Sequence, residues 1–302
     1  MQRNRCKVCK MSLCNACPRN CNVDRQTAVG FCGANENIKV AKAYLHEWEE
    51  PFISGQKGSG TVFFSHCNLK CVFCQNYKIS AQGFGKYVSQ DELYAIFKNL
   101  EKQGANNINL VTPSHFVSQI VPVLKKFKAD SNLPVVYNCG GYESIDTLKM
   151  LEGLVDVYLP DMKYVDSRIS SKYSHVADYF EKNILAVKEM KRQQPKDIFV
   201  DGLLKKGLAI RHLVMPNLVD QSKKILDWIG DNLGLDTLIS LMSQYQPFYR
   251  AGEFKEIDRK ITAREYCRVI EYAEQKGFEN ILCQESSSSD EKYVPSFDLE
   301  GV

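Results

Sequence analysis

From residue 61 onward the chain alternates between short apolar segments and longer amphipathic ones, and this alternation is the strongest constraint on its fold. Short apolar runs are typical of buried strands, and apolar residues at helical spacing are typical of surface helices. Strands are predicted at 61–65, 107–112, 134–138, 155–159, 207–214 and 237–241. Helices are predicted at 90–103, 114–129, 143–153, 169–192, 219–233 and 262–276, the first with Ser89 and Glu92 as a capping box. The pattern predicts an α/β fold with a parallel sheet and helical crossovers.

The number of units leaves two architectures open. Six strands are too few for a closed (β/α)8 barrel, so a partial, open barrel and a doubly wound sheet both fit. In either case, ligands are expected at the C-terminal ends of the strands. An apolar run at 280–283 follows the last predicted helix, and residues 285–302 are predicted to be a surface extension.

The twelve cysteines are unevenly distributed. Six lie within residues 6–32 and three within 67–74, whereas Cys139, Cys267 and Cys283 are scattered and are expected to be buried core residues. The sequence has no apolar run of membrane-spanning length and begins without the apolar stretch of a signal peptide, so a cytoplasmic location is predicted. Cytosolic thiols stay reduced, and tight spacing then indicates metal or cluster binding instead of disulfides.

The first predicted strand runs directly into the motif Cys67-x3-Cys71-x2-Cys74. Three thiolates on one loop can bind three irons of a [4Fe–4S] cluster and leave the fourth iron open. An open coordination position is typical of a catalytic site, whereas structural sites are closed. The alternatives are a zinc knuckle, or an electron-transfer cluster with Cys139 as a distant fourth ligand.

A second cysteine set lies near the N-terminus, in the pattern Cys14-x2-Cys17-Pro-x2-Cys21-x10-Cys32, with Cys6-x2-Cys9 before it. Four thiols suit either tetrahedral zinc or a second Fe–S cluster, and the spacing does not decide between them. We therefore interpret residues 1–35 as a metal-binding module that needs its metal to fold. Residues 36–58 are interpreted as a bridging segment and 59–284 as the core domain.

Four segments of the chain, 59–80, 106–117, 155–164 and 210–217, resemble the pyruvate formate-lyase-activating-enzyme-like proteins of the radical SAM superfamily, and an uncharacterised branch of them in particular. The superfamily signature is CxxxCxxC with an aromatic residue before the third cysteine, and Phe73 has that position. The resemblance implies a partial (β/α)6 barrel that binds S-adenosylmethionine (SAM) at a [4Fe–4S] cluster. It also implies cleavage of SAM to a 5′-deoxyadenosyl radical that abstracts hydrogen from a protein or peptide, which could be a glycyl radical enzyme. The electron donor would be a flavodoxin or ferredoxin.

Residues at the strand ends are the candidates for binding SAM. Many members of the superfamily have a Gly-Gly-Glu motif after the second strand, and here backbone carbonyls and Thr112 or Asn109 would take over that role. Asn138 follows on the third strand, and Asp161 and Lys163 match an Asp-x-Lys of the related enzymes. Arg211 interrupts an apolar strand, where a charge must be paired or face a polar cavity. The alternatives are a plain turn at Asn138, a surface pair of Asp161 with Lys163, and a structural bridge from Arg211 to Asp161.

Two other classes of function also fit the cysteine pattern. A zinc- or Fe–S-bearing binding module would explain the cysteines, as would an electron carrier without SAM chemistry. The net charge of +3 is too weak to indicate nucleic acid or an anionic membrane as a partner. An α/β scaffold of six units is also larger than an electron carrier requires.

Overall fold

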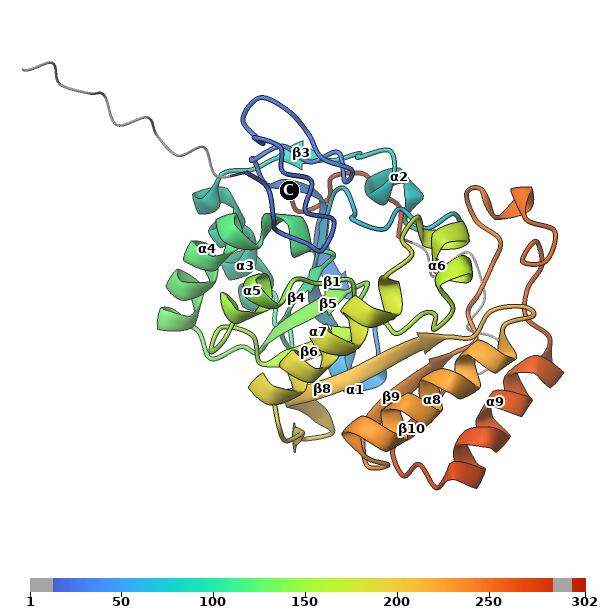
Figure 1. The fold of residues 1–302 in the computed structure, drawn as a ribbon. Coiled ribbons are helices and arrows are strands. Elements are labelled where there is room, and N and C mark those ends of the chain that lie inside the picture. Colours follow the sequence, from blue (N-terminus) through green and yellow to red (C-terminus); the bar gives the residue numbers. More distant parts are fainter. Residues whose placement is uncertain (1–12, 285–294) are drawn as a thin grey trace, which may run out of the picture.

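The computed structural model describes residues 13–284 and 295–302, so Cys6, Cys9 and residues 285–294 lie outside the described part of the chain. A 10-stranded sheet forms its centre (Figure 1), in the order β10-β9-β8-β6-β5-β4-β2-β1-β3, with β7 paired to β8 off this path. The strands are β1 (Lys39–His46), β2 (Ser59–Phe64), β3 (Lys86–Tyr87), β4 (Ile108–Val111), β5 (Val135–Cys139), β6 (Val157–Pro160), β7 (Ile198–Val200), β8 (Leu203–Leu213), β9 (Leu238–Met242) and β10 (Ile281–Cys283). The helices are α1 (Pro51–Ser54), α2 (Tyr77–Ser80), α3 (Gln90–Lys102), α4 (Val117–Asp130), α5 (Ile145–Lys149), α6 (Ser167–Ser174), α7 (Tyr179–Gln193), α8 (Val219–Leu233) and α9 (Ala263–Lys276), with short 3-10 turns at Ser114–Phe116 and Ala251–Glu253.

The six predicted strands are confirmed as β2, β4, β5, β6, β8 and β9, and neighbours among them pair in parallel. The apolar run at 280–283 adds β10, parallel to β9. The register aligns one row of side chains across five strands, Val62, Leu110, Tyr137, Tyr158 and Leu208. All five belong to a single apolar core. Because side chains alternate along a strand, this row marks one face of the sheet as the main packing surface.

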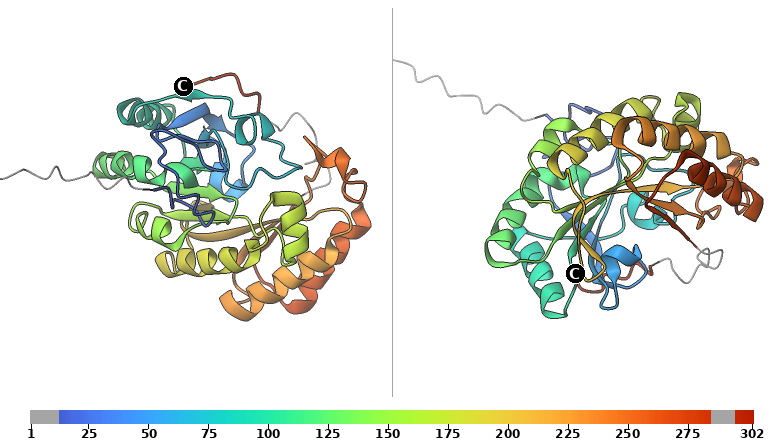
Figure 2. Two further views of the ribbon diagram at one scale, coloured as in Figure 1. Left: turned by 45° about the horizontal axis from the view of Figure 1, so that its top comes forward. Right: turned by 90° about the horizontal axis from the view of Figure 1, so that it is seen from below.

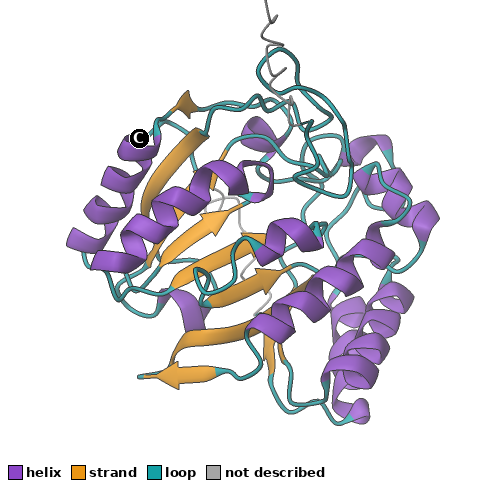
Figure 3. Ribbon diagram, turned by 60° about the vertical axis from the view of Figure 1, so that its left-hand side comes forward, coloured by secondary structure: helices purple, strands orange, loops and turns teal. Residues whose placement is uncertain are grey.

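That face is covered by the long helices. Contacts join α3 to α4, α5 to α7 and α8 to α9, and these helices share one core with the strands. Figures 2 and 3 show the helices following the curve of the sheet on its outer side, so the chain adopts the open-barrel arrangement and not the doubly wound one. Among the helices of residues 13–284 and 295–302, none has the length and apolar character to cross a membrane.

The inner face of the sheet is apolar near the start of the strands and polar near their carboxyl ends. Near the start of the strands, Phe52 and Ile53 of α1 pack against Val136, Val157 and Ala209 and form a separate apolar cluster. This cluster closes the lower end of the curved sheet. Polar inner residues therefore come together only toward the carboxyl ends of the strands, where α/β proteins bind ligands.

Three features differ from the sequence prediction. Cys139 is buried as expected, but Cys267 and Cys283 are exposed, on α9 and at the outer strand β10. The single helix predicted at 169–192 is wrong, because it divides into α6 and α7 at His175, which has a left-handed conformation (φ 58°). Residues 36–58, interpreted as a bridging segment, contain β1, which pairs antiparallel with β2 over Val40–His46. The capping box of Ser89 and Glu92 is confirmed at the start of α3.

Candidate active site

The motif cysteines lie on a tight loop that starts where β2 ends. The loop is anchored at its base, where the His66 N–H donates to the Ile79 carbonyl at 2.7 Å. His66 and Lys70 both have positive φ (74° and 51°), a conformation uncommon outside glycine. Such strained residues concentrate at functional sites, where the surrounding structure holds them in place. Here they fold the chain so that three thiols occupy one short loop.

Each motif thiol accepts or shares a hydrogen bond. The Leu69 N–H donates to Cys67 Sγ at 3.4 Å, and the Ser80 hydroxyl donates to Cys74 Sγ at 3.3 Å. Cys71 Sγ lies 2.9 Å from the Ser174 hydroxyl at the end of α6. Burial raises the pKa of each of the three thiols to about 11. Without metal the thiols are therefore protonated at neutral pH, and metal binding would release their protons.

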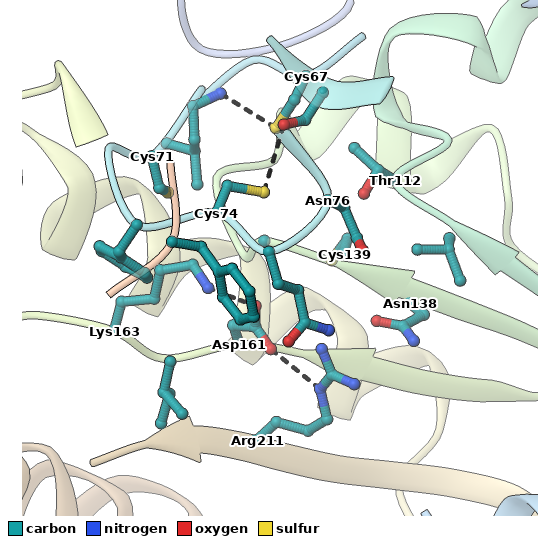
Figure 4. Close-up of a pocket in the computed structure, with 18 of the residues that line it drawn as sticks. Cys67, Cys71, Cys74, Asn76, Thr112, Asn138, Cys139, Asp161, Lys163 and Arg211 are labelled. Carbon is teal, nitrogen blue, oxygen red and sulfur yellow. Dashed lines mark hydrogen bonds and ion pairs between the residues drawn. The ribbon is translucent and has the colours of Figure 1, made fainter. Parts of the chain in front are cut away.

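The thiols share a cavity with the residues expected to bind SAM. Figure 4 shows the cysteine loop on one side of this cavity and the ends of the strands on the other. The cavity brings together every candidate from the sequence except the N-terminal cysteines. Its lining includes Cys67, Cys71, Phe73, Cys74, Thr112, Asn138, Asp161, Lys163 and Arg211.

A buried network of charges forms the floor of the cavity. Asp161 Oδ2 lies 2.5 Å from Lys163 Nζ, and Asp161 Oδ1 lies 3.0 Å from Arg211 Nε. Arg211 also reaches Glu49 Oε1 at 3.0 Å. All four side chains are at most 18% exposed, so the interpretation of Asp161 and Lys163 as a surface pair is wrong. The bridge from Arg211 to Asp161 is present, and it lies at the edge of the cavity.

Neighbouring charges keep this network ionised. Burial alone would raise the pKa of Asp161, but Lys163 and Arg211 outweigh it and lower that pKa. Burial would likewise lower the pKa of Lys163, and Asp161 reverses the effect and raises it. A buried ion pair of this kind is stable only while both partners are present. The cavity therefore offers both an ammonium and a carboxylate to a bound ligand.

Glu49 is a site residue that the sequence analysis missed. Its Oε2 accepts from Asn109 Nδ2 at 3.0 Å and from Asn138 Nδ2 at 3.2 Å, while Oε1 binds Arg211. It comes from the segment between β1 and α1, outside the βα units. No local pattern distinguishes it from the neighbouring Glu47 and Glu50, so only the fold could identify it.

Thr112, expected to replace the Gly-Gly-Glu motif, follows β4 with φ of 58°. A left-handed conformation is a genuine outlier for a β-branched residue. Its N–H donates to the Asn138 carbonyl at 2.8 Å, which holds the ends of β4 and β5 together. The residue thus lies at the cavity in a conformation that the local sequence does not favour.

The residues present fit a [4Fe–4S] cluster and SAM. In residues 13–284 and 295–302, no three Cys, His, Asp or Glu side chains are placed to ligate one metal ion. In a cubane cluster each thiolate binds a different iron, so its ligands need not converge on one point. The adjoining cavity also contains an unsatisfied acceptor, since the buried Asn76 Oδ1 has no protein partner. Buried polar atoms are normally paired, and a polar ligand would satisfy this one.

Cys139 belongs to the outer core and not to the thiol set. Strand alternation places it on the same face as Tyr137, in the main apolar core. Its thiol interacts with Glu143, which also accepts hydrogen bonds from Ser114 and Tyr137. This placement does not support Cys139 as the distant fourth ligand of an electron-transfer cluster.

Glu143 gives a testable pH dependence. Burial raises its pKa to about 7, outweighing the hydrogen bonds that it accepts. A carboxyl group whose pKa is higher in the folded state stabilises the fold below its ordinary pKa, and this contribution is lost as pH rises toward 7. We expect Glu143→Gln to be more stable than the natural chain by about 3 kcal/mol near pH 8, with the difference vanishing below about pH 4.5. Urea unfolding at both pH values measures this, and an equal difference at both would contradict it.

The N-terminal cysteines lie close to one another and to the motif loop. The Phe31 N–H donates to Cys21 Sγ and the Ala34 N–H to Cys32 Sγ, both at 3.4 Å. Burial raises the pKa of Cys17 to about 12, with smaller contributions from Glu143, Cys32 and Cys21. Cys14 and Cys21 also raise the pKa of Cys32 slightly, beside the larger effect of burial, although no three of these thiols are placed to ligate one metal ion.

Arg19 connects this group to the motif loop. Arg19 Nε donates to the Asn68 carbonyl at 2.7 Å, and its other nitrogens reach the carbonyls of Ser174 and His175. Its guanidinium also lies 3.4 Å from the centre of the Phe31 ring. The N-terminal cysteines are therefore packed directly against the loop that carries Cys67.

Comparison with known proteins now identifies the family. The family model described as the radical SAM superfamily matches residues 61–229. The chain belongs to the radical SAM superfamily. Membership implies an enzyme that uses a [4Fe–4S] cluster and SAM, which the binding-module and electron-carrier alternatives do not require. An uncharacterised protein of Methanocaldococcus jannaschii is 34% identical over 275 residues, covering 87% of this chain and 74% of that protein.

Two solved structures share the fold. The chain is similar to Streptococcus suis SuiB bound to S-adenosylmethionine, with TM-score 0.53, 14% identity and coverage of 72% of this chain and 48% of that one. It is also similar to SuiB bound to its precursor peptide SuiA, with TM-score 0.52, 13% identity and coverage of 72% and 46%. The chain thus spans about half the length of these proteins, and the likeness extends to the fold alone.

Proposed function

We propose that this radical SAM enzyme abstracts hydrogen from a protein or peptide, with the cluster bound by Cys67, Cys71 and Cys74. The observation that carries the proposal is the placement of three buried or partly buried thiols and the Asp161–Lys163–Arg211 network around one cavity. When bound, the cluster and SAM would supply a 5′-deoxyadenosyl radical by one-electron cleavage of SAM. The electron donor would be a flavodoxin or ferredoxin.

The chain's own residues would bind and orient SAM. Lys163 and Arg211 can pair with its carboxylate, and Asp161 can accept a hydrogen bond from its amino group. Thr112 and Asn138 would hold the ligand at the ends of β4 and β5. The buried ring of Phe73, packed 5.7 Å from Tyr245 between ring centres, would help to exclude water.

The favoured hydrogen donor is the glycine of a glycyl radical enzyme, because the motif segments resemble the pyruvate formate-lyase-activating-enzyme-like branch. The test mixes the reduced, SAM-loaded enzyme with a glycyl radical enzyme from the same organism under anaerobic conditions. We expect the electron paramagnetic resonance doublet of a stable glycyl radical. Cleavage of SAM without that doublet would contradict the activating role and leave the radical SAM chemistry in place.

We also propose that Cys14, Cys17, Cys21 and Cys32 hold a second metal group, either zinc or an Fe–S cluster. Their mutual proximity and the two N–H···S bonds support it, since such bonds stabilise thiolates.

Replacing Cys32 with alanine should remove this second group and leave the motif cluster intact. We expect the loss of one zinc ion per chain, or of about four irons if the group is a [4Fe–4S] cluster. Metal analysis of the anaerobically purified protein measures the loss, with Cys267→Ala as the control because that exposed cysteine lies on α9. Unchanged metal content in the Cys32→Ala protein would contradict the second site.

A further inference from the structure

The last eight residues of the chain, 295–302, lie along β1. The Ala43 N–H donates to the Glu300 carbonyl at 2.9 Å, and the Phe297 ring packs edge-on against Phe63 with 5.6 Å between centres. Figure 1 shows this C-terminal segment beside β3, at the other end of the sheet from β10. Because β3 pairs only with Lys39 and Val40, the rest of that edge of β1 is available to another segment.

Lys42 gives this edge of β1 a positive charge that pairs with acidic residues. Its side chain is only 6% exposed, and its amine lies 3.1 Å from Asp298 and 2.8 Å from Glu300. Those two carboxylates are 53% and 59% exposed. The tail itself covers Lys42, and its two half-exposed carboxylates pair with the ammonium. The edge of β1 therefore favours an acidic segment.

The tail also reaches the candidate active site. Pro295 lines a polar cavity together with His46, Glu49 and the exposed side chain of Trp48. This cavity shares Asn76, Asn138 and Arg211 with the cavity of the motif cysteines. A peptide bound along β1 as residues 295–302 are would therefore place the residues N-terminal to its own proline near the site of chemistry.

We propose that this edge of β1 is the docking groove for the peptide substrate, and that the chain's own tail occupies it when substrate is absent. The groove, defined by Lys42, Ala43 and Phe63, would take an extended segment with an aromatic residue followed by acidic residues one and three positions later, as in Phe297, Asp298 and Glu300. Recognition would combine backbone hydrogen bonds with side-chain pockets, as in other cases of strand addition. The inference rests on the proposed hydrogen abstraction from a peptide.

The binding test uses a chain that ends at residue 294 and a fluorescein-labelled peptide, Pro-Ser-Phe-Asp-Leu-Glu-Gly-Val. Fluorescence anisotropy should show saturable binding, weakened at least tenfold for the intact chain, whose groove is filled. Lys42→Met in the shortened chain should also weaken binding at least tenfold, because the ion pairs are lost. Lys102→Met, at the exposed end of α3, should have no effect.

A folded shortened chain that does not bind the peptide, or that binds it equally well with Lys42→Met, overturns the proposed groove. If the shortened chain does not fold, the intact chain carrying D298N and E300Q replaces it and must bind the peptide.

A second test asks whether a peptide bound in the groove is a substrate, or whether the groove only packs against the tail. The same shortened, reduced enzyme receives SAM, dithionite as electron source, and the peptide extended at its N-terminus by α-deuterated glycines. Deuterium should move from a glycine Cα to the 5′ carbon, leaving the unpaired electron on the peptide, and Lys42→Met should abolish the transfer. Formation of 5′-deoxyadenosine without deuterium would overturn the docking proposal. Absence of 5′-deoxyadenosine would instead contradict the proposed function.

Discussion

Cys71→Ala should lose the motif cluster and all cleavage of SAM. Cys71 is buried, shares a hydrogen bond with Ser174, and is the middle member of three thiols that would each bind a different iron. Two remaining ligands leave the cluster with two unligated irons, so we expect about four fewer irons and sulfides per chain. Iron and sulfide analysis of the anaerobically reconstituted protein provides the measurement.

The matched control for this substitution is Cys139→Ala. Cys139 is the last residue of β5 and lines the same cavity, but it belongs to the outer core, where its thiol interacts with Glu143. It should keep the full iron content and the cleavage of SAM. Equal iron loss in both variants would mean that Cys139 is a ligand and that the site resembles an electron-transfer cluster.

Arg211→Met should have the largest effect on the stability of the fold. The substitution leaves Asp161 and Glu49 buried without their shared cation, and breaking a buried pair costs about 3–5 kcal/mol. The same change removes a cation that would hold the SAM carboxylate. We therefore expect both a lower free energy of unfolding, measured in urea, and weaker SAM binding, measured by equilibrium dialysis.

Two variants separate these effects. Arg211→Lys retains the charge but not the forked geometry, so it should recover most of the stability and less of the binding. Arg250→Met breaks a surface pair with Glu253, whose two side chains are 47% and 51% exposed, and should cost less than about 1 kcal/mol. If Arg211→Met were as mild as Arg250→Met, the network would not hold the floor of the cavity together.

The predictable parts of the molecule are those encoded locally. The parallel strands appear in the sequence because each is an apolar run of the right length, and the motif cysteines appear because all three thiols lie on one loop. β1 was missed because Lys42 interrupts its apolar pattern, and the acidic partners of Lys42 lie more than 250 residues away in the tail. Glu49 was missed for the same reason, since its partners Arg211 and Asn138 come from distant strands. The break after α6 depends on the single left-handed residue His175, which no periodicity reveals.

The candidate SAM-binding residues at the strand ends were predictable in position but not in pairing. Parallel strands place their carboxyl ends together, so Thr112, Asn138, Asp161 and Arg211 could be expected at one edge before their contacts were known. Their pairing could not be predicted, because the sequence does not indicate which carboxylate each cation meets. The structure shows that Asp161 forms ion pairs with both Lys163 and Arg211.

Cleavage of SAM by the natural chain tests the central claim most directly. The protein would be reconstituted with iron and sulfide under anaerobic conditions, reduced with dithionite and incubated with SAM, and the products separated by liquid chromatography. The account predicts 5′-deoxyadenosine and methionine, formed only when cluster, reductant and SAM are all present. A protein that binds its full complement of iron and SAM but forms no 5′-deoxyadenosine, with or without candidate peptides, would contradict it.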